Sequence, residues 1–195
     1  MTCTPPTVGK MLDVSSVQHP DNAPINWHAV KEAGFDYVMI KATEGVGYTN
    51  PFLDQDMHGA LGAGLGVGYY HFCHPSNPVA AEFGHFAAVV KGRPHQIGLA
   101  MDCEIMEGMS WGALKVWCED FMFRLHTITD WPIMYSNENW LDNLIGAPWG
   151  NRLWYAHPTT RPRRQVWAWQ QAPISVAGVP DTVDHSTLYE LPKVG

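Results

Sequence analysis

The sequence predicts a single α/β barrel with eight strands, in which strands and helices alternate along the chain. Short apolar runs alternate with helical patterns through the first five strands, which implies parallel strands joined by right-handed crossovers. The length of 195 residues suits one domain with a full core, and eight strands are enough to close a ring. An open, doubly wound sheet is the alternative. A nucleotide-binding version of it is disfavoured, because SSVQHP rather than G-x-G-x-x-G follows the first strand.

The pattern opens with two strands, each followed by a helix. Residues 10–16 and 36–43 are rich in apolar side chains, and the second run is almost continuously apolar, as buried parallel strands are. We expect helices over residues 26–33 and 50–63. Each begins with an asparagine that can cap its first turn, and in the second helix a proline follows at the first helical position.

The alternation continues through three more strands and three more helices. Gly92 is placed to end the first of these helices, and Ser110 can cap the second. The strands are expected at residues 65–72, 97–104 and 132–136, and the helices at residues 78–91, 110–127 and 138–144.

The last part of the chain is expected to add three short strands with little helix between them. Residues 152–156, residues 165–171 and the stretch around Val183 have the pattern of strands, and the loops that join them are rich in proline. The barrel is therefore expected to lack its last helices. We assign residues 1–8 to an N-terminal tail and residues 9–195 to the barrel.

Composition narrows the functional classes. Hydrophobic residues make up 46% of the chain and charged residues 16%, with a net charge of −7, which disfavours both a disordered chain and a nucleic-acid partner. No apolar run is long enough to cross a membrane, and the N-terminus lacks the apolar stretch of a signal peptide. The 9 tryptophans and 7 tyrosines are typical of sugar-binding sites, although single rings more often fill a core. The 4 cysteines have no zinc-like spacing and are expected to be reduced and mostly buried.

Acidic residues stand at the ends of several predicted strands. Asp13 closes the first strand, Glu44 follows the second, Asp102 and Glu104 close the fourth, and Asp184 lies near the end of the last. In β/α barrels the chemistry takes place at the carboxyl ends of the strands, so these side chains are expected to meet at one edge. Their convergence predicts a catalytic site.

The D-x-E pair carries the most chemical information. Residues i and i+2 of a strand share a face, so the side chains of Asp102 and Glu104 are expected to point the same way, with Cα atoms about 6–7 Å apart. Cys103 would then face the helix layer. We expect burial and the charge of Asp102 to raise the pKa of Glu104, which is the division of roles that glycoside hydrolysis needs. A structural salt-bridge cluster with Lys41 or an arginine is the alternative.

Two other chemistries leave weaker signals. His71 and His74 form an H-x-x-H pair that could serve a metal-dependent hydrolase, but they lie where a strand meets a loop, and the zinc-protease pattern H-E-x-x-H is absent. A serine-hydrolase elbow, G-x-S-x-G, is absent as well. We therefore expect neither a metal nor a cofactor.

Seven fragments, among them MLDVSSVQHP, AMDCE and GVPDTVDHS, occur in a fixed order along the chain. In this order the set resembles the glycoside hydrolase family 25 lysozymes, the N-acetylmuramidases of bacteria, fungi and phage endolysins, from about residue 9 to residue 190. Cys103 departs from the family pattern, in which a plain aliphatic residue is expected at this position. The fragments span residues 11–27, 36–56, 63–72, 100–104, 132–140, 153–157 and 166–186.

The resemblance implies a flattened barrel with fewer than eight helices, and hydrolysis of the β-1,4 bond from N-acetylmuramic acid to N-acetylglucosamine in peptidoglycan. By motif, Glu104 would be the general acid/base. Asp102 would be its partner and would orient the substrate's N-acetyl group in a retaining, substrate-assisted reaction. Asp13 and Asp184 match the other acids of the family's active site. The residues expected to bind substrate are Tyr70, Tyr135, Trp154, Gln170 and Glu44.

The resemblance also implies partners and a place of action. The chain is expected to act as a monomer on the glycan strands of the bacterial cell wall, without nucleic acid or membrane insertion. Lacking a signal peptide, it would stay in the cytoplasm until release, as a phage endolysin, or leave by another route. One alternative is a barrel that binds cell-wall glycan without cleaving it. A chitinase-like glycosidase is another, but its D-x-x-D-x-D-x-E run is absent.

Overall fold

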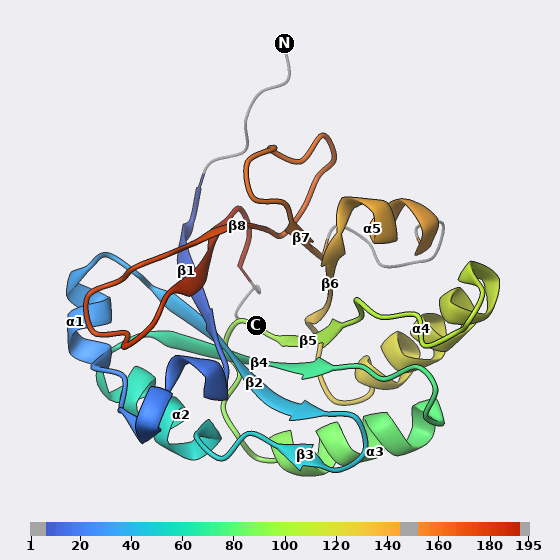
Figure 1. Cartoon of the computed structure of the whole chain (residues 1–195), viewed down its shortest axis with the longest axis horizontal. Helices are drawn as coiled ribbons and strands as arrows, with labels where there is room; N and C mark the ends of the chain where they lie inside the picture. The colour runs from blue at the N-terminus through green and yellow to red at the C-terminus, as the bar shows by residue number, and fades with distance from the viewer. Residues whose placement is uncertain (1–6, 145–151, 192–195) are drawn as a thin grey trace.

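The computed structural model describes residues 7–144 and 152–191. Within them, eight strands form a closed ring: β1 (Gly9–Val14), β2 (Tyr37–Glu44), β4 (Gly66–Phe72), β5 (Leu99–Asp102), β6 (Pro132–Asn137), β7 (Leu153–Ala156), β8 (Ala168–Ile174) and β9 (Val183–Leu188) (Figure 1). The ring closes because β1 pairs with both β2 and β9. The predicted barrel is confirmed, and the alternative of an open sheet is excluded. A two-residue strand that the sequence did not predict, β3 (Tyr48–Thr49), extends the sheet beside β2.

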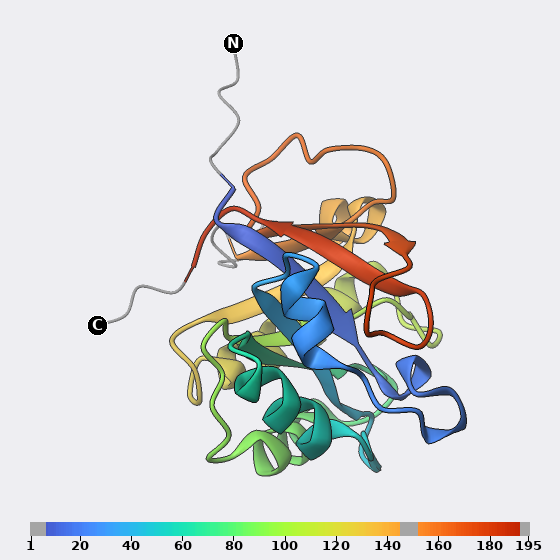
Figure 2. The ribbon, with the colours of Figure 1, turned by 90° about the vertical axis from the view of Figure 1, so that its left-hand side faces the viewer.

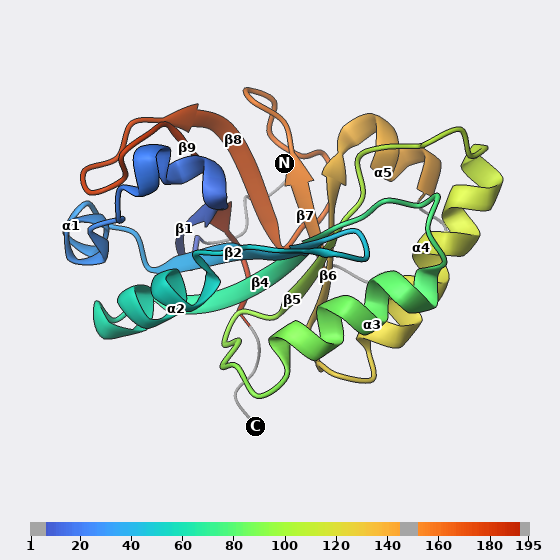
Figure 3. The same ribbon diagram turned by 60° about the horizontal axis from the view of Figure 1, so that its bottom comes forward.

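Five α-helices flank the ring in the described part of the chain: α1 (Trp27–Glu32), α2 (Leu53–Gly62), α3 (Val79–Val90), α4 (Trp111–Leu125) and α5 (Glu138–Leu144). This confirms a barrel with fewer than eight helices. In Figure 3, α2, α3 and α4 follow one another around one side of the ring. Two short 3-10 turns, Ser16–Gln18 and Pro20–Asn22, follow β1. Among the described residues, no helix has both the length and the apolar character that crossing a membrane requires.

The last strand, β9, runs antiparallel to its neighbours β1 and β8, whereas the other neighbouring strands of the ring are parallel. The prediction that Asp184 lies near the end of a strand is therefore wrong. Residues 175–182, between β8 and β9, are too few for a crossover helix, so the chain turns back as a hairpin. Figure 2 shows β9 lying alongside β1. Because β9 is reversed, its start, which carries Asp184, meets the carboxyl ends of the parallel strands.

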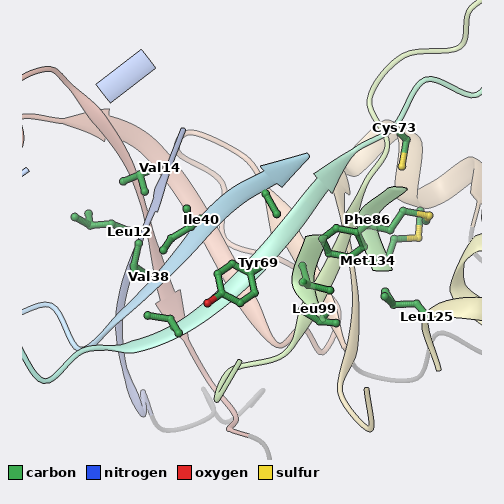
Figure 4. Packing of buried hydrophobic residues seen from close by; sticks show 14 of the residues in the cluster. Leu12, Val14, Val38, Ile40, Tyr69, Cys73, Phe86, Leu99, Leu125 and Met134 are labelled. Carbon is green, nitrogen blue, oxygen red and sulfur yellow. The ribbon is translucent and has the colours of Figure 1, made fainter. Parts of the chain in front are cut away.

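Side chains alternate between two apolar cores, one inside the ring and one between the ring and the helices. Leu12 of β1 points outward and lies with Val38 and Ile40 of β2 in the outer core, as Figure 4 shows. Met11 points inward, and Asp13, two residues later, lies on the same face of β1. The Asp13 carboxylate is therefore directed into the ring. The inner core contains strand and loop residues: Met11, Met39, Ile97, Ala100, Ile133, Tyr135, Trp154, Trp167, Ala168 and Leu188.

A buried histidine–aspartate pair ties the loop after β1 to α2. His19 Nε2 lies 2.9 Å from Asp56 Oδ2, and both side chains are fully buried. The other ring nitrogen, Nδ1, faces the carbonyl oxygen of Ala23 at 2.9 Å, so Nδ1 is the donor there. Phe52 stacks on the imidazole, with ring centroids 3.9 Å apart. Burial raises the pKa of Asp56 to about 6, although the hydrogen bond with His19 opposes the rise.

We expect Asp56→Ala to lower the free energy of unfolding by about 3–5 kcal/mol, because it leaves a buried imidazole without its partner. Asp54→Ala is the matched control, two residues earlier on α2. Asp54 makes an exposed ion pair with Arg93 (2.8 Å), which contributes at most about 1 kcal/mol. Urea unfolding of the two variants measures both losses. Equal losses would contradict the assignment of the His19–Asp56 pair as the anchor of this loop.

Candidate active site

Four carboxylates converge inside the ring at the edge where the parallel strands end. Asp13 of β1 lies opposite Asp184 of β9 in the strand register. Asp102 is the last residue of β5, and Glu104 follows it outside the strand, so the predicted strand over residues 97–104 is too long. Burial, and after it the charges of all four acids, hold the pKa of the Tyr70 hydroxyl well above its usual value. Four of the five acids predicted to meet at this edge therefore converge in the fold, and Glu44 is not among the charges that act on Tyr70.

Asp102 and Glu104 share a hydrogen bond, in which the carboxyl of Asp102 donates to Glu104. Asp102 is 5% exposed, and its burial, followed by the charge of Glu104, raises its pKa well above the ordinary range. The pKa of Glu104 is also raised, by burial and by the charge of Asp184. Of the two causes expected for the raised pKa of Glu104, burial is confirmed. The other, the charge of Asp102, is wrong, because the hydrogen bond from Asp102 lowers the pKa of Glu104. The pair therefore holds on to one proton over a wide range of pH.

A chain of hydrogen bonds fixes Asp13. The amide nitrogen of Gln170 donates to both carboxylate oxygens of Asp13, at 3.0 and 3.1 Å, and the Tyr135 hydroxyl donates to the amide oxygen of Gln170 at 2.7 Å. Burial and the charge of Asp184 raise the pKa of Asp13 to about 8, although the bond from Gln170 opposes the rise. Gln170 and Tyr135, both predicted to bind substrate, thus position an acid of the site.

The predicted sugar-binding tryptophan lies in the inner core. Trp154 is 2% exposed, and its ring meets that of Tyr135 edge to face, with centroids 4.6 Å apart. A second edge contact, at 6.3 Å, joins it to Tyr70. Its indole Nε1 donates to the hydroxyl of Ser186 at 2.9 Å. Trp154 therefore supports the two tyrosines from within. Ser186 was missed, although its position two residues after Asp184 on the same face of β9 could have indicated it.

Lys41 contributes a positive charge to the site. Its ammonium makes an ion pair with Glu44 and lies 4.7 Å from the centroid of the Phe72 ring. The charge of Lys41 lowers the pKa of both Asp102 and Glu104. Lys41 thus makes its ion pair with Glu44 and not with the D-x-E pair. The alternative, a structural salt-bridge cluster of Asp102 and Glu104 with Lys41, had expected the reverse. The sequence had marked Lys41 only as a partner in that alternative.

Glu44, predicted to bind substrate, is engaged by side chains of the protein. Its second carboxylate oxygen lies 3.0 Å from His74 Nε2, and His74 Nδ1 lies 2.7 Å from Glu107. Burial alone would raise the pKa of Glu44, but the hydrogen bonds from Lys41 and His74 hold it below its usual value. Hydrogen bonds from the hydroxyl and backbone of Ser76 lower the pKa of Glu107 to about 2. No local pattern indicated Glu107, because its partners are far away in the sequence.

The two histidines considered as a metal pair have separate partners. His71 is buried in the outer core, where Nε2 lies 2.8 Å from Glu82 and Nδ1 lies 2.7 Å from the hydroxyl of Thr43. Burial lowers the pKa of His71 in spite of the bond to Glu82. His74 instead bridges Glu44 and the loop beyond β5. The fold therefore does not bring the two imidazoles to one centre.

Comparison with known proteins places this arrangement in a family. Residues 12–174 match the family model described as glycosyl hydrolases family 25. The chain belongs to this family. The matched range of this family 25 glycosyl hydrolase includes Asp13, Asp102, Glu104 and Gln170, while Asp184 lies beyond it.

Relatives and a solved structure agree with the assignment. An N,O-diacetylmuramidase of Chalaropsis sp is 31% identical over 155 residues, which cover 69% of this chain and 69% of that protein. An autolytic lysozyme of Clostridium acetobutylicum is 36% identical over 101 residues, and the match covers 52% of this chain but only 30% of that protein. The crystal structure of the bacterial lysozyme from Streptomyces coelicolor superposes with a TM-score of 0.78 at 27% identity, covering 94% of this chain and 93% of that chain.

The contribution of Asp13 to the stability of this family 25 barrel should fall as the pH rises from about 4 to about 8. The pKa of Asp13 is about 8 in the folded chain against an ordinary 3.8, so between these values unfolding releases a proton. We expect Asp13→Asn, which cannot ionise, to unfold at higher urea than the wild type at pH 8, by on the order of 1–3 kcal/mol, and close to it at pH 4. A wild-type advantage that grows toward pH 8 would contradict the raised pKa.

Proposed function

We propose that this family 25 glycosyl hydrolase is a lysozyme that cleaves the β-1,4 bond from N-acetylmuramic acid to N-acetylglucosamine in peptidoglycan. The observation that carries the proposal is the buried Asp102–Glu104 pair, in which the pKa of both carboxyls is raised. A carboxyl whose pKa is raised keeps its proton to higher pH than an ordinary one and can protonate a leaving group, as glycoside hydrolysis requires. The names of the relatives from Chalaropsis and Streptomyces support the same substrate.

Glu104 acts as the general acid and then as the general base. It is less buried than Asp102, and it lies beyond the end of β5, where a glycosidic oxygen can approach it. In the first step the proton that Asp102 shares with Glu104 moves to Glu104 and passes from it to that oxygen, as the bond to the anomeric carbon breaks. In the second step the resulting carboxylate takes a proton from the water that attacks the same carbon.

Asp102 orients the N-acetyl group of the substrate. Its side chain lies at the end of β5 and is 5% exposed, so the carboxyl is placed to accept the N–H of the acetamido group at the edge of the ring. Fixing that N–H turns the acetamido carbonyl oxygen toward the anomeric carbon, where it serves as the nucleophile. Water then opens the cyclic intermediate from the opposite face, so the configuration at the anomeric carbon is retained.

The remaining residues of the site hold hydrogen bonds and charge around the sugar. Asp13, with a pKa of about 8, carries a proton at neutral pH and can donate it in a hydrogen bond. Asp184 stabilises positive charge that develops at the anomeric carbon. The pKa of Tyr70 and that of Tyr135 are raised, so both hydroxyls keep their protons: Tyr70 can donate to the sugar, while Tyr135 donates to Gln170.

The proposed activity places the protein at the bacterial cell wall. Its substrate is the glycan strand, and one copy of the barrel supplies all the acids that the reaction uses. The chemistry consists of proton transfers and an attack by the substrate's own acetamido group, so it calls for neither a metal nor a cofactor.

We expect Glu104→Gln to lower the rate at which purified cell walls release new reducing ends by about 10²–10⁴-fold, because the general acid is lost. The matched control is Glu32→Gln, the same change at an exposed position of α1, which should keep the wild-type rate.

Two results would overturn parts of this proposal. If the wild type releases no reducing ends but still sediments with cell walls, the barrel binds glycan without cleaving it. If Glu104→Gln keeps the rate of Glu32→Gln, the chain is a hydrolase, but its acid is another residue.

We expect the rate of the wild type to fall at high pH, as the Asp102–Glu104 pair loses its last proton, and to fall at low pH, as the other acids protonate. In the wild type the last proton leaves a carboxyl that lies beside a second carboxylate, and that repulsion opposes its loss. In Asp102→Asn, Glu104 ionises beside a neutral amide, so the high-pH fall should move to lower pH in this variant. The normalised pH profile of kcat/KM measures the shift. A high-pH limb that stays in place would show that the two carboxyls do not titrate as a pair.

A further inference from the structure

The residue between the two proposed acids lies in contact with a second buried thiol. Cys103 faces away from the ring, as its position between Asp102 and Glu104 predicted, and belongs to the outer core. The thiol of Cys118, in the middle of α4, donates to Cys103 Sγ at a distance of 3.6 Å. Both side chains are completely buried. The proposed reaction gives no role to either sulfur.

We propose that Cys103 and Cys118 form a disulfide when the chain folds under oxidising conditions, and that this bond ties the segment bearing the proposed acids to α4. The oxidant is a low-molecular-weight disulfide such as oxidised glutathione. One cysteine thiolate attacks it, forming a mixed disulfide and releasing one glutathione thiolate. The second cysteine thiolate then displaces the other glutathione, so two electrons pass from the cysteines to the oxidant and two protons are released.

The positions of the two residues favour this bond. A disulfide needs its sulfur atoms about 2.05 Å apart, so the two sulfurs must approach each other by roughly 1.5 Å. Cys103 is held by its backbone, because its carbonyl oxygen accepts the hydroxyl of Ser136 at 2.9 Å. The approach therefore comes mainly from Cys118, whose side chain turns from a helix that already packs on this segment.

A third buried thiol, Cys73, is the competing partner. It is near enough for its charge to interact with that of Cys103, but its own thiol donates to the carbonyl oxygen of His71 at 3.8 Å. The sulfur in contact with Cys103 is that of Cys118. The contact selects the Cys103–Cys118 pair over the Cys73–Cys103 pair.

Burial determines when the bond can form. The attacking species in disulfide exchange is the thiolate, and in the folded chain the hydrogen bond with Cys118, together with burial, raises the pKa of Cys103. Oxidised glutathione also has no path to completely buried sulfurs. The exchange therefore takes place while the chain folds, and the folded, reduced protein resists the same oxidant.

The full chain can be tested in two preparations. One is made in a reducing cytosol, unfolded in urea with a reductant, and refolded with reduced and oxidised glutathione. The other is exported to an oxidising periplasm and needs no refolding. In both, free thiols are blocked with iodoacetamide in denaturant, and the peptides are mapped by mass spectrometry without reduction. We expect a linked pair of peptides that contains Cys103 and Cys118.

Two single variants identify which cysteines form the linked pair in the peptide map. Cys73→Ala should keep the Cys103–Cys118 link, and Cys118→Ala should abolish it. Alkylated Cys103 and Cys118 in the wild type from both preparations would overturn the proposal, and so would any other partner of Cys103. These results concern the bond alone, so they leave the proposed lysozyme activity untouched.

A stability measurement gives an independent check on the mapped bond. A link between residues 15 apart in the sequence should raise the thermal midpoint of the oxidised wild type over the reduced wild type by roughly 6–12 °C. Cys118→Ala should show no difference between the two conditions. Equal midpoints for the two forms of the wild type would show that the bond does not stabilise the segment.

Discussion

The closure of the ring at β1 is the constraint on which the rest of the structure depends. This strand pairs in parallel with β2 and antiparallel with β9, so the first and last strands of the chain become neighbours. Asp13 and Asp184 then face each other in register, and Asp102 lies near enough to Asp13 for their charges to interact. An open sheet of the same strands would leave β1 and β9 at its two edges, and their carboxylates would not meet.

Closure also explains the chemistry of the acids. Burial inside the ring disfavours the charged form of each carboxyl, so the pKa of each of the four acids is raised. Repulsion by neighbouring acids adds to the effect for Asp13, Asp102 and Glu104. The protein opposes this with the amide of Gln170, which bonds Asp13, and the ammonium of Lys41, which acts on the D-x-E pair. Burying these acids makes the barrel less stable. The same burial keeps a carboxyl protonated, and the proposed reaction uses that proton.

The sequence could predict what depends on near neighbours in the chain. Helices and strands follow local patterns, and strand alternation correctly directed Asp102 inward and Cys103 outward. Contacts between segments far apart in the chain could not be predicted from the sequence. The direction of β9 depends on the hairpin that follows β8, which the sequence did not reveal. Asp184 was therefore predicted at the correct edge of the barrel, but at the end of its strand instead of the start. In the same way, the pairing of His19 with Asp56 joins a loop to a helix that no periodic pattern connects.

The most direct test of this account is the identity of the sugar at the new reducing ends. Purified peptidoglycan of defined composition is digested with the wild type, the ends are reduced with borohydride, and the products are separated and identified by mass spectrometry. The account predicts that the reduced sugar is derived from N-acetylmuramic acid. Reduced ends derived from N-acetylglucosamine would contradict it, because the acids would then act on the other glycosidic bond of the strand.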